Sequence, residues 1–296
     1  MTAGVESDLA RIFEEAGGRA FLHACEVDGH RQIGLDEDEP VVTASVFKVP
    51  VMLELARQAA SGELDLTERV MVPARRRTQG PTGLSVMRDD VELSLRDLAY
   101  LMMSVSDNTA TDMLMERVGP DRIAATLAAL GLEHTALPED CAELLAGLAS
   151  DLGLDIGEDG ASHSFSDLDP EMLAAARALT PTATNRTTPR EMTTLLTLIW
   201  RDEAGPPDAC AEVRRIMGLQ VWPHRLSSGF PDGVKVAGKT GTLPGIRNEA
   251  GVVEYPDGGR YAVAVFTRAR SYAFQQPTMD AAIGTAAHLA VEALRG

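Results

Sequence analysis

A serine and a lysine three positions apart begin an apolar stretch of this chain, TASVFKVPVMLELARQ, at residues 43–58. The apolar spacing predicts a helix over about 43–60, in which Ser45 and Lys48 share one face. A serine attacks a carbonyl carbon only after a base has taken its proton, and a lysine can be that base once its pKa falls below about 10.4. Free N–H groups in the first helical turn would stabilise the oxyanion. The pair therefore predicts acyl transfer through a serine nucleophile.

Lysine is scarce in this sequence, and the scarcity bears on the same chemistry. Among 27 basic residues only three are lysines, namely Lys48, Lys235 and Lys239. Arginine does not release its proton in a protein, whereas a desolvated lysine can. This bias indicates that the lysines are retained because a lysine can release its proton. The alternative is that the three lysines remained by chance during evolutionary drift.

Two further short motifs contain groups that suit acyl transfer. The S-D-N segment at 106–108 offers a hydroxyl that could relay a proton to a leaving group and an amide that could bind the substrate. The K-T-G segment at 239–241 offers a second cation, Lys239, on a strand-like stretch where Gly241 permits close approach of a ligand backbone. The three motifs together indicate one site assembled from distant parts of the chain.

The elements that must position these motifs follow from periodicity and turn residues. Alternating patterns bounded by turns predict strands at 19–27, 31–34, 233–242, 248–255 and 261–268. Helical spacing and capping residues predict helices on both sides of the S-D-N segment and at 5–16, 43–60, 121–130, 169–179, 188–201, 209–219 and 278–294. The stretch 133–168 has no firm period and is expected to be an irregular connection with one helix near 142–148.

Strands at both ends and helices in the middle indicate an α+β fold. We expect one antiparallel sheet that is built from both termini and flanked by the terminal helices, with an all-helical lobe inserted. The chain would then form a single domain over 1–296. Its sheet lobe would comprise about 1–42 and 230–296, and its helical lobe about 43–229.

The order S-x-x-K, S-D-N, K-T-G is similar to that of the class A β-lactamases and their relatives among the penicillin-recognising serine hydrolases. The segments ASVFKVPV, SLRDLAYLMMSVSDNTATDML, NRTTPREM and KTGTLPG also resemble this family. The resemblance runs from about residue 21 to the end and is weakest over 133–180. It implies the two-lobed α/β fold of that family and catalysis through an acyl-enzyme.

Carried over to this sequence, the resemblance implies a role for each residue of the first two motifs. Ser45 would be the acylated nucleophile, and Lys48 would be the base for acylation or the partner of that base. Ser106 would pass a proton to the leaving atom, and Asn108 would bind the acyl amide of the substrate.

The resemblance also implies how the substrate is held. Lys239 and Thr240 would bind its carboxylate, and Gly241 would let its backbone come close. The backbone N–H groups of Ser45 and Thr242 would form the oxyanion hole. No cofactor is implied, and no metal site is expected because the six histidines show no metal-ligand spacing.

One part of the family pattern is missing from this sequence. Class A enzymes carry a glutamate in an E-x-x-L-N stretch that activates the water for deacylation, and this chain has no such stretch. The nearest match, DPEML, offers Asp169 or Glu171 as a deacylation base. The alternative is that Asp169 caps a helix and Glu171 lies in its first turn. Without a base, the acyl-enzyme would hydrolyse slowly or by another route.

The sequence thus predicts a serine hydrolase acting on a small molecule, with β-lactam hydrolysis as the first choice of reaction. An esterase, an amidase or a biosynthetic acyl-transfer enzyme would use the same residues on a different substrate. A penicillin-binding sensor or sink, which is acylated without turnover, is a further alternative. The first 20 residues are acidic where a secretory leader needs a basic start and an apolar run, so a cytoplasmic location is expected if Met1 is the natural start.

Composition narrows the range of partners. The net charge of −17 argues against binding to nucleic acid or to an anionic membrane, because both need clustered basic residues. No apolar run approaches the roughly 18 residues of a membrane span. Cys25, Cys141 and Cys210 have no C-x-x-C spacing and are expected to be reduced, packed thiols. Arg225 is expected at the surface, with the edge of the substrate pocket as the alternative.

Overall fold

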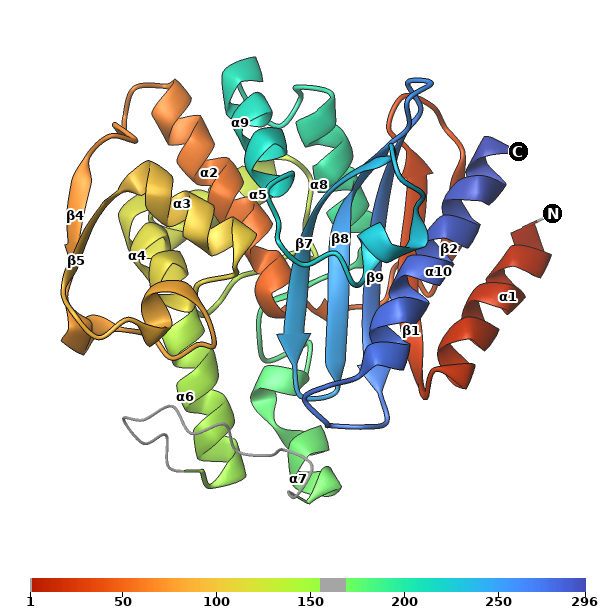
Figure 1. Cartoon of the computed structure of the whole chain (residues 1–296), viewed down its shortest axis with the longest axis horizontal. Coiled ribbons are helices and arrows are strands. Elements are labelled where there is room, and N and C mark those ends of the chain that lie inside the picture. The colour runs from red at the N-terminus through yellow and green to blue at the C-terminus, as the bar shows by residue number, and fades with distance from the viewer. Residues whose placement is uncertain (1, 155–168) are drawn as a thin grey trace.

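The chain folds around one antiparallel sheet to which both ends of the sequence contribute. The computed structural model describes residues 2–154 and 169–296. The sheet has the strand order β2-β1-β9-β8-β7 and consists of β1 (Gly18–Glu26), β2 (Gln32–Leu35), β7 (Lys235–Leu243), β8 (Ile246–Glu254) and β9 (Arg260–Ala269). Phe21 of β1 pairs with Phe266 of β9, so the first and last strands are neighbours inside the sheet (Figure 1). The expected α+β fold is confirmed.

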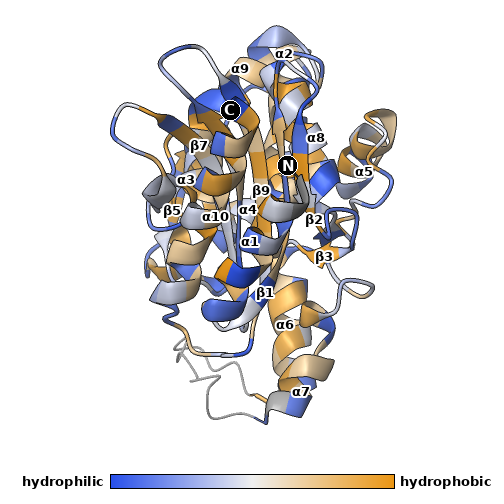
Figure 2. Cartoon of the chain, turned by 90° about the vertical axis from the view of Figure 1, so that its right-hand side faces the viewer, coloured by the Kyte–Doolittle hydropathy of each residue, from blue (hydrophilic) through white to orange (hydrophobic). Residues whose placement is uncertain are grey.

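Helices cover both faces of this sheet. On one face lie α1 (Thr2–Glu15) and α10 (Pro277–Arg295), with the two ends of the chain near each other (Figures 1 and 2). On the other face, α8 packs directly against β1 and β9. The helices inserted between the outer parts of the sheet are α2 (Lys48–Ala60), α3 (Leu95–Ser104), α4 (Asn108–Val118), α5 (Pro120–Ala129), α6 (Cys141–Leu152), α7 (Pro170–Ala175), α8 (Pro189–Trp200) and α9 (Pro207–Met217).

Successive side chains of each strand enter two different hydrophobic cores. Leu22 and Val263 lie in the core between the sheet and the terminal helices, together with Ile283 of α10. Phe21 and Phe266 lie in the larger core that the sheet shares with the inserted helices. This alternation with a period of two residues is why the strands at the two ends of the sequence could be recognised.

The helices agree with the sequence-based expectation except at their ends. The helix expected from residue 43 begins at Lys48, because Ala44–Phe47 form a separate 3₁₀ turn, η1. The helix expected near 142–148 is α6. The helix expected over 169–179 ends at Ala175 and is followed by a 3₁₀ turn at Arg177–Leu179. Part of the expected irregular connection, 155–168, lies outside the described residues.

Two short strand pairs have no counterpart in the expectation. The first joins β3 (Val41–Val42) to β6 (Arg186–Thr187), and the second joins β4 (Arg69–Val72) to β5 (Val91–Ser94). In neither pair does a two-residue turn link the strands, and such a turn is the strongest local signal of a hairpin. The connection between α2 and α3 is therefore more ordered than its sequence indicates.

The three cysteines form no disulfide among the described residues. Cys141 and Cys210 are buried, Cys25 is half-buried, and all three are free thiols, as expected. Along the described residues, no helix is both long enough and apolar enough to cross a membrane.

Candidate active site

Ser45 lies in η1, which packs against β7. Ala44 has a φ of 45°, a left-handed conformation that is uncommon outside glycine, and it turns the chain just before Ser45. Gly241 of β7 faces this turn, since a Cβ atom at that position would stand 2.6 Å from Thr43 O and 3.2 Å from Ser45 N. Only glycine allows β7 to lie directly against the serine.

Lys48 is fully buried and contacts the S-D-N segment. Its Nζ donates to Ser106 O at 2.7 Å and to Asn108 Oδ1 at 2.9 Å, and it lies 3.3 Å from Ser106 Oγ. The backbone N–H of Lys48 donates to Ser45 O, but among the described residues no hydrogen bond joins the Lys48 amine to the Ser45 hydroxyl. The expected spacing is present, but the amine is directed toward Ser106.

Lys239 reaches the same hydroxyl from β7. Its Nζ donates to Ser106 Oγ at 2.9 Å and to Thr240 O at 2.8 Å, and its side chain is fully buried. Ser106, held at a φ of 63°, therefore places its Oγ between two amines that come from residues 58 and 133 positions away. The structure brings all three motifs together.

Burial lowers the pKa of both lysines. For Lys239 the positive charge of Lys48 adds to the effect of burial, and the pKa lies well below the ordinary value for lysine. For Lys48, burial lowers the pKa, and the negative charges of Asp107 and Asp112 act in the opposite direction. Two desolvated amines that share one hydroxyl do not readily hold a proton each. The pair thus favours a state in which one amine is neutral and can accept a proton.

The outer edge of β7 faces this site. β7 is an edge strand, and Thr240 N donates to Gln220 Oε1 at 2.8 Å. In an antiparallel strand alternate residues direct their N–H groups to the same edge, so the N–H of Thr242 points to the same side as that of Thr240. The Thr242 amide therefore lies on the edge that Gly241 brings against Ser45.

Arg225 is buried, with 2% of its surface exposed, so the surface position expected for it is wrong. Its guanidinium donates to Asp280 Oδ1 at 2.7 Å, to Asn248 O at 2.8 Å, to Thr242 Oγ1 at 2.9 Å and to Gly241 O at 3.0 Å. It fixes the end of β7 behind the site. The local sequence, WPHRL, gave no sign of these contacts because three of the four partners belong to the K-T-G strand and its neighbour.

Asn108 is held on both sides of its amide. Its Oδ1 accepts from Lys48, and its Nδ2 donates to Gln79 O at 2.7 Å. The Asp107 carboxylate accepts from the backbone N–H groups of Leu84 and Ala110, which ties the same loop to the start of α4. Among the described residues, the second N–H of the Asn108 amide has no partner and could donate to a ligand. Sequence reasoning missed the loop that orients this amide.

The two acidic residues considered for deacylation lie apart from these groups. Asp169 is the N-cap of α7, and its Oδ1 accepts from the backbone N–H of Glu171 at 2.9 Å. Figures 1 and 2 both show α7 at the base of the molecule, beside α6 and away from the main body of the sheet. Among the described contacts, neither residue touches Ser45, Lys48 or Ser106.

Two residues close to Lys48 were not identified from the sequence. Asp112 of α4 and Cys141, the first residue of α6, both act on the charge of Lys48. Burial raises the pKa of the Cys141 thiol to about 12. The signal for Asp112 was its place four residues after Asn108 in one helix, which puts both on the same face. No comparable signal marks Cys141.

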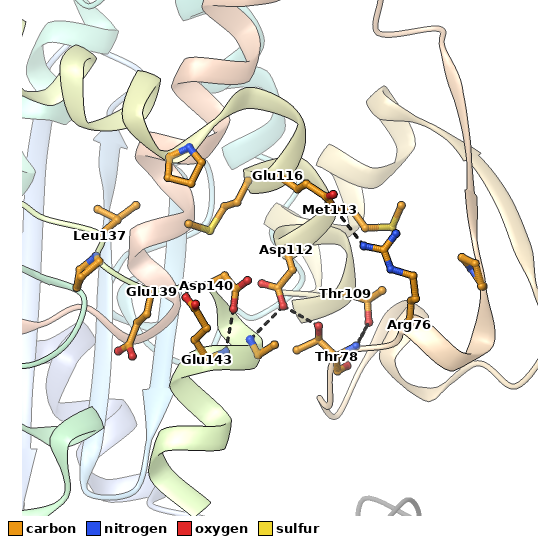
Figure 3. Close-up of a pocket in the computed structure, with 15 residues that line it drawn as sticks. Arg76, Thr78, Thr109, Asp112, Met113, Glu116, Leu137, Glu139, Asp140 and Glu143 are labelled. Carbon is orange, nitrogen blue, oxygen red and sulfur yellow. Dashed lines mark hydrogen bonds and ion pairs between the residues drawn. The ribbon is translucent and has the colours of Figure 1, made fainter.

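A cavity of about 430 Å³ opens beside Asp112 (Figure 3). Five carboxylates line it, from Asp112, Glu116, Glu139, Asp140 and Glu143. Burial raises the pKa of Glu139 and of Asp112. In the part of the chain that the structure describes, no three side chains of His, Cys, Asp or Glu are arranged to hold a metal ion.

The chain is similar in sequence to β-lactamases and to a β-lactamase regulatory protein over most of its length. A model of the "Beta-lactamase enzyme family" matches residues 4–294. The β-lactamase regulatory protein BlaB of Streptomyces cacaoi is 33% identical over 288 residues, covering 89% of each chain. The extended-spectrum β-lactamase PER-1 of Pseudomonas aeruginosa is 26% identical over 235 residues, covering 76% of this chain and 66% of that protein.

Solved structures share the fold over nearly the whole chain. A β-lactamase from Sphaerobacter thermophilus has a TM-score of 0.78 at 25% sequence identity, covering 99% of this chain and 97% of the other. PBP-A has a TM-score of 0.78 at 20% identity, covering 99% of this chain and 96% of its own. A further structure is the acyl-enzyme complex of an L158E mutant of PBP-A with penicillin G, again at 20% identity.

Proposed function

Because this chain belongs to the β-lactamase enzyme family, we propose that it is a serine hydrolase in which β-lactams acylate Ser45 and the acyl group is then hydrolysed slowly. The observation with the most weight is the position of Ser106 Oγ between the buried amines of Lys48 and Lys239. A hydroxyl in that position can pass a proton, and the lowered pKa of both amines makes a neutral base available.

Acylation is proposed to proceed as follows. The neutral amine of Lys48 takes the proton of Ser45, and Ser45 Oγ attacks the carbonyl carbon of the β-lactam ring. The carbon–nitrogen bond of the ring then breaks, and the nitrogen receives a proton by way of Ser106. The contacts of Lys48 run to Ser106 and Asn108, and catalytic hydrogen bonds often become well aligned only in the substrate complex.

Substrate binding is proposed to use the outer edge of β7. The N–H groups of Ser45 and Thr242 would hold the oxyanion, and Thr240 with the Lys239 charge would bind the carboxylate of the substrate. Gly241 supports this arrangement by keeping the strand close to the serine. The free N–H of Asn108 is the remaining donor for the acyl amide.

Deacylation is proposed to be slow because the titratable groups near Lys48 are poorly suited to take a proton from the water that would hydrolyse the acyl-enzyme. The Asp107 carboxylate already accepts from two backbone N–H groups. Asp112 accepts from Thr78 Oγ1 and from two N–H groups of α6. Cys141, with a pKa of about 12, is protonated near neutral pH. Asp169 is occupied as a helix cap, so a role for it or Glu171 as the deacylation base is the less favoured proposal.

A second candidate function is a penicillin sensor that is acylated without appreciable turnover. It is favoured by the same occupied carboxylates and by the likeness to a protein named as a β-lactamase regulatory protein. An esterase or amidase that uses the same serine is the third candidate, since an alkoxide leaves more readily than an amide nitrogen. These candidates share Ser45 and differ in the lifetime and identity of the adduct.

An intact-mass time course with benzylpenicillin separates the candidates. We expect a mass increase equal to one penicillin that forms on the native protein and disappears slowly after free penicillin is removed, whereas an adduct that does not disappear would favour the sensor. A transient adduct with turnover at or above about 10 per second would show that deacylation is efficient. No adduct with penicillin, together with an adduct or turnover on small esters, would favour the esterase.

The nucleophile is tested in the same assay. Ser45→Ala should form no adduct with penicillin or with esters, because both reactions need the same hydroxyl. Ser61→Ala is the matched control, since Ser61 caps the other end of α2, and it should be acylated like the native protein. An adduct on Ser45→Ala would show that the nucleophile is a different residue.

A further inference from the structure

Asp112 lies on the same face of α4 as Asn108, the side chain that binds the Lys48 amine. Asn108 accepts from Lys48 Nζ at 2.9 Å, and Asp112 follows Asn108 by four residues in the same helix. Residues at i and i+4 of a helix are neighbours on its surface, with Cβ atoms about 5–6 Å apart. The Asp112 carboxylate therefore stands one turn beyond the amide that holds the amine.

The same carboxylate joins three segments of the chain (Figure 3). Its Oδ2 accepts from Thr78 Oγ1 at 2.6 Å, in the loop that also orients Asn108. Its two oxygens accept from the backbone N–H groups of Cys141 at 2.8 Å and Ala142 at 3.1 Å, the first two residues of α6. Asp112 thus connects α4, this loop and the start of α6 beside the active site.

Charged or titratable groups from three elements act on Lys48. Asp107 caps α4 and Asp112 belongs to it, Cys141 begins α6, and Lys239 lies on β7. Asp107 is committed to capping α4, and Cys141 is protonated near neutral pH. Asp112 differs from both, because its carboxylate also accepts hydrogen bonds from the start of α6.

We propose that Asp112 is a positioning residue that acts through Lys48: its negative charge holds the proton on that amine and so sets the lower pH limit for acylation of Ser45. The proposal rests on the acyl-enzyme function proposed above. The chemical direction follows from Coulomb attraction. A negative neighbour favours the charged form of an amine, and acylation needs the neutral form.

Asp112→Asn removes the charge and keeps most of the hydrogen bonds. The amide Oδ1 can accept from the N–H groups of α6, and Nδ2 can donate to Thr78 Oγ1, whose hydroxyl rotates to suit. Without the carboxylate, the pKa of Lys48 should fall. The rate of acylation should then rise at a lower pH than in the native protein.

The direct test is an NMR titration of lysine. Protein labelled with ¹³Cε-lysine gives three signals, because the chain has only three lysines, and Lys235→Arg with Lys239→Arg assigns them. We expect the midpoint of the Lys48 signal to fall by about half a pH unit or more in Asp112→Asn. Asp140→Asn is the matched control, since Asp140 caps α6 next to Asp112 and asparagine caps about equally well. Its Lys48 midpoint should equal that of the native protein.

Acylation by benzylpenicillin provides the second readout. Below the native midpoint, Asp112→Asn should be acylated about threefold faster or more, which corresponds to half a pH unit. An unchanged Lys48 midpoint in folded Asp112→Asn, with only a loss of melting temperature, would overturn the inference. If Asp112→Asn does not fold, Asp112→Ser serves with the same expectations. A shifted midpoint without any adduct on the native protein would refute the acyl-enzyme function and with it the proposed role of Asp112, while the charge coupling itself stood.

Discussion

Two of the three lysines in this chain are fully buried around one serine hydroxyl, and the third is exposed at the start of β7. Lys48 and Lys239 both reach Ser106 Oγ, whereas Lys235 faces solvent. A chain that otherwise uses arginine for positive charge has thus placed lysine where a proton could move. The distribution supports proton chemistry over chance survival for two of the three.

Arginine substitutions test this interpretation directly. Lys48→Arg should be acylated nearly as slowly as Lys48→Ala, because arginine keeps the charge and cannot give up its proton. Lys239→Arg should retain more activity, since a positive charge is the main requirement proposed there. Lys235→Arg is the control and should match the native protein. The measurement is the rate of adduct formation, and fast acylation of Lys48→Arg would remove the argument from lysine scarcity.

Burial of these amines also makes stability depend on pH in a known direction. Because the pKa of Lys239 is lowered in the folded state, the folded chain releases this proton at a lower pH than the unfolded chain, which holds it up to about pH 10.4. The stability of the native protein should therefore rise with pH relative to a Lys239→Met variant. Melting temperatures at pH 7 and pH 9.5 give the comparison. A Lys235→Met variant should show a constant difference, and a constant difference for Lys239→Met would contradict the expectation.

At the scale of elements, the site depends on the contact between η1 and β7. The 3₁₀ turn offers the serine, and the edge strand offers the K-T-G residues. They meet because Ala44 adopts a left-handed conformation and Gly241 has no side chain. Neither condition could be read as a contact from the sequence, although the glycine itself was noted as a place of close approach.

Gly241→Ala should separate these two elements. The added Cβ would meet Thr43 O at 2.6 Å, which real Cβ atoms do not tolerate, so β7 or η1 must shift. A displacement of about 1 Å can cost on the order of 100-fold in rate. We expect slow acylation with a folded protein, measured by adduct formation and thermal melting. Gly4→Ala in α1, where a Cβ meets open space, is the control, and equal acylation rates in the two variants would refute the contact argument.

The start of α7 decides between the two interpretations of Asp169. If the residue only caps the helix, Asp169→Asn should be nearly silent and Asp169→Ala should cost about 1 kcal/mol of stability. The lifetime of the penicillin adduct should be the same in both variants. If Asp169 or Glu171 were the deacylation base, Asp169→Asn or Glu171→Gln would leave acylation fast and make the adduct accumulate. Intact mass during turnover and a melting curve distinguish the two results.

Local sequence patterns predicted the type and place of many elements, but not the contacts between residues that are distant in the sequence. Helices such as α8 and strands such as β9 carry a full period of apolar residues and clear boundaries, so their type and place were recognisable. The order of three motifs was enough to identify the candidate nucleophile. Arg225, Asp112 and Cys141 were missed or misjudged because their partners are distant in the sequence, and a buried arginine is not distinguishable from an exposed one by local pattern.

At the scale of the whole molecule, the proposed sheet and helical lobes share one core. Phe21 and Phe266 of the sheet pack in the same cluster as Val49 of α2, Leu114 of α4 and Leu195 of α8. A cluster that crosses the boundary between lobes couples their unfolding. The single domain proposed for 1–296 is consistent with this packing, and α8 belongs to the sheet by contact although it lies within the proposed helical lobe by sequence.

Unfolding should therefore be a single transition. Far-UV circular dichroism reports helices of both lobes, and fluorescence reports Trp200 of α8 and Trp222, which lies on the connection to β7. We expect both probes to give the same midpoint in urea. A fragment of residues 43–229 alone should show no cooperative transition. A plateau between two midpoints, or cooperative folding of the fragment, would show that the lobes are independent.

The pairing of β1 with β9 also governs the timing of folding during synthesis. β1 ends at Glu26, while its partner β9 ends at Ala269, so β1 is synthesised long before its partner. At about 5–20 residues per second, β1 waits roughly ten to fifty seconds with one edge unpaired. During that time the β1–β2 hairpin exposes an apolar strand to any neighbouring chain. Nascent copies of this protein should therefore depend on chaperones until the last strand is released, and truncation before β9 should yield aggregates rather than a smaller folded protein.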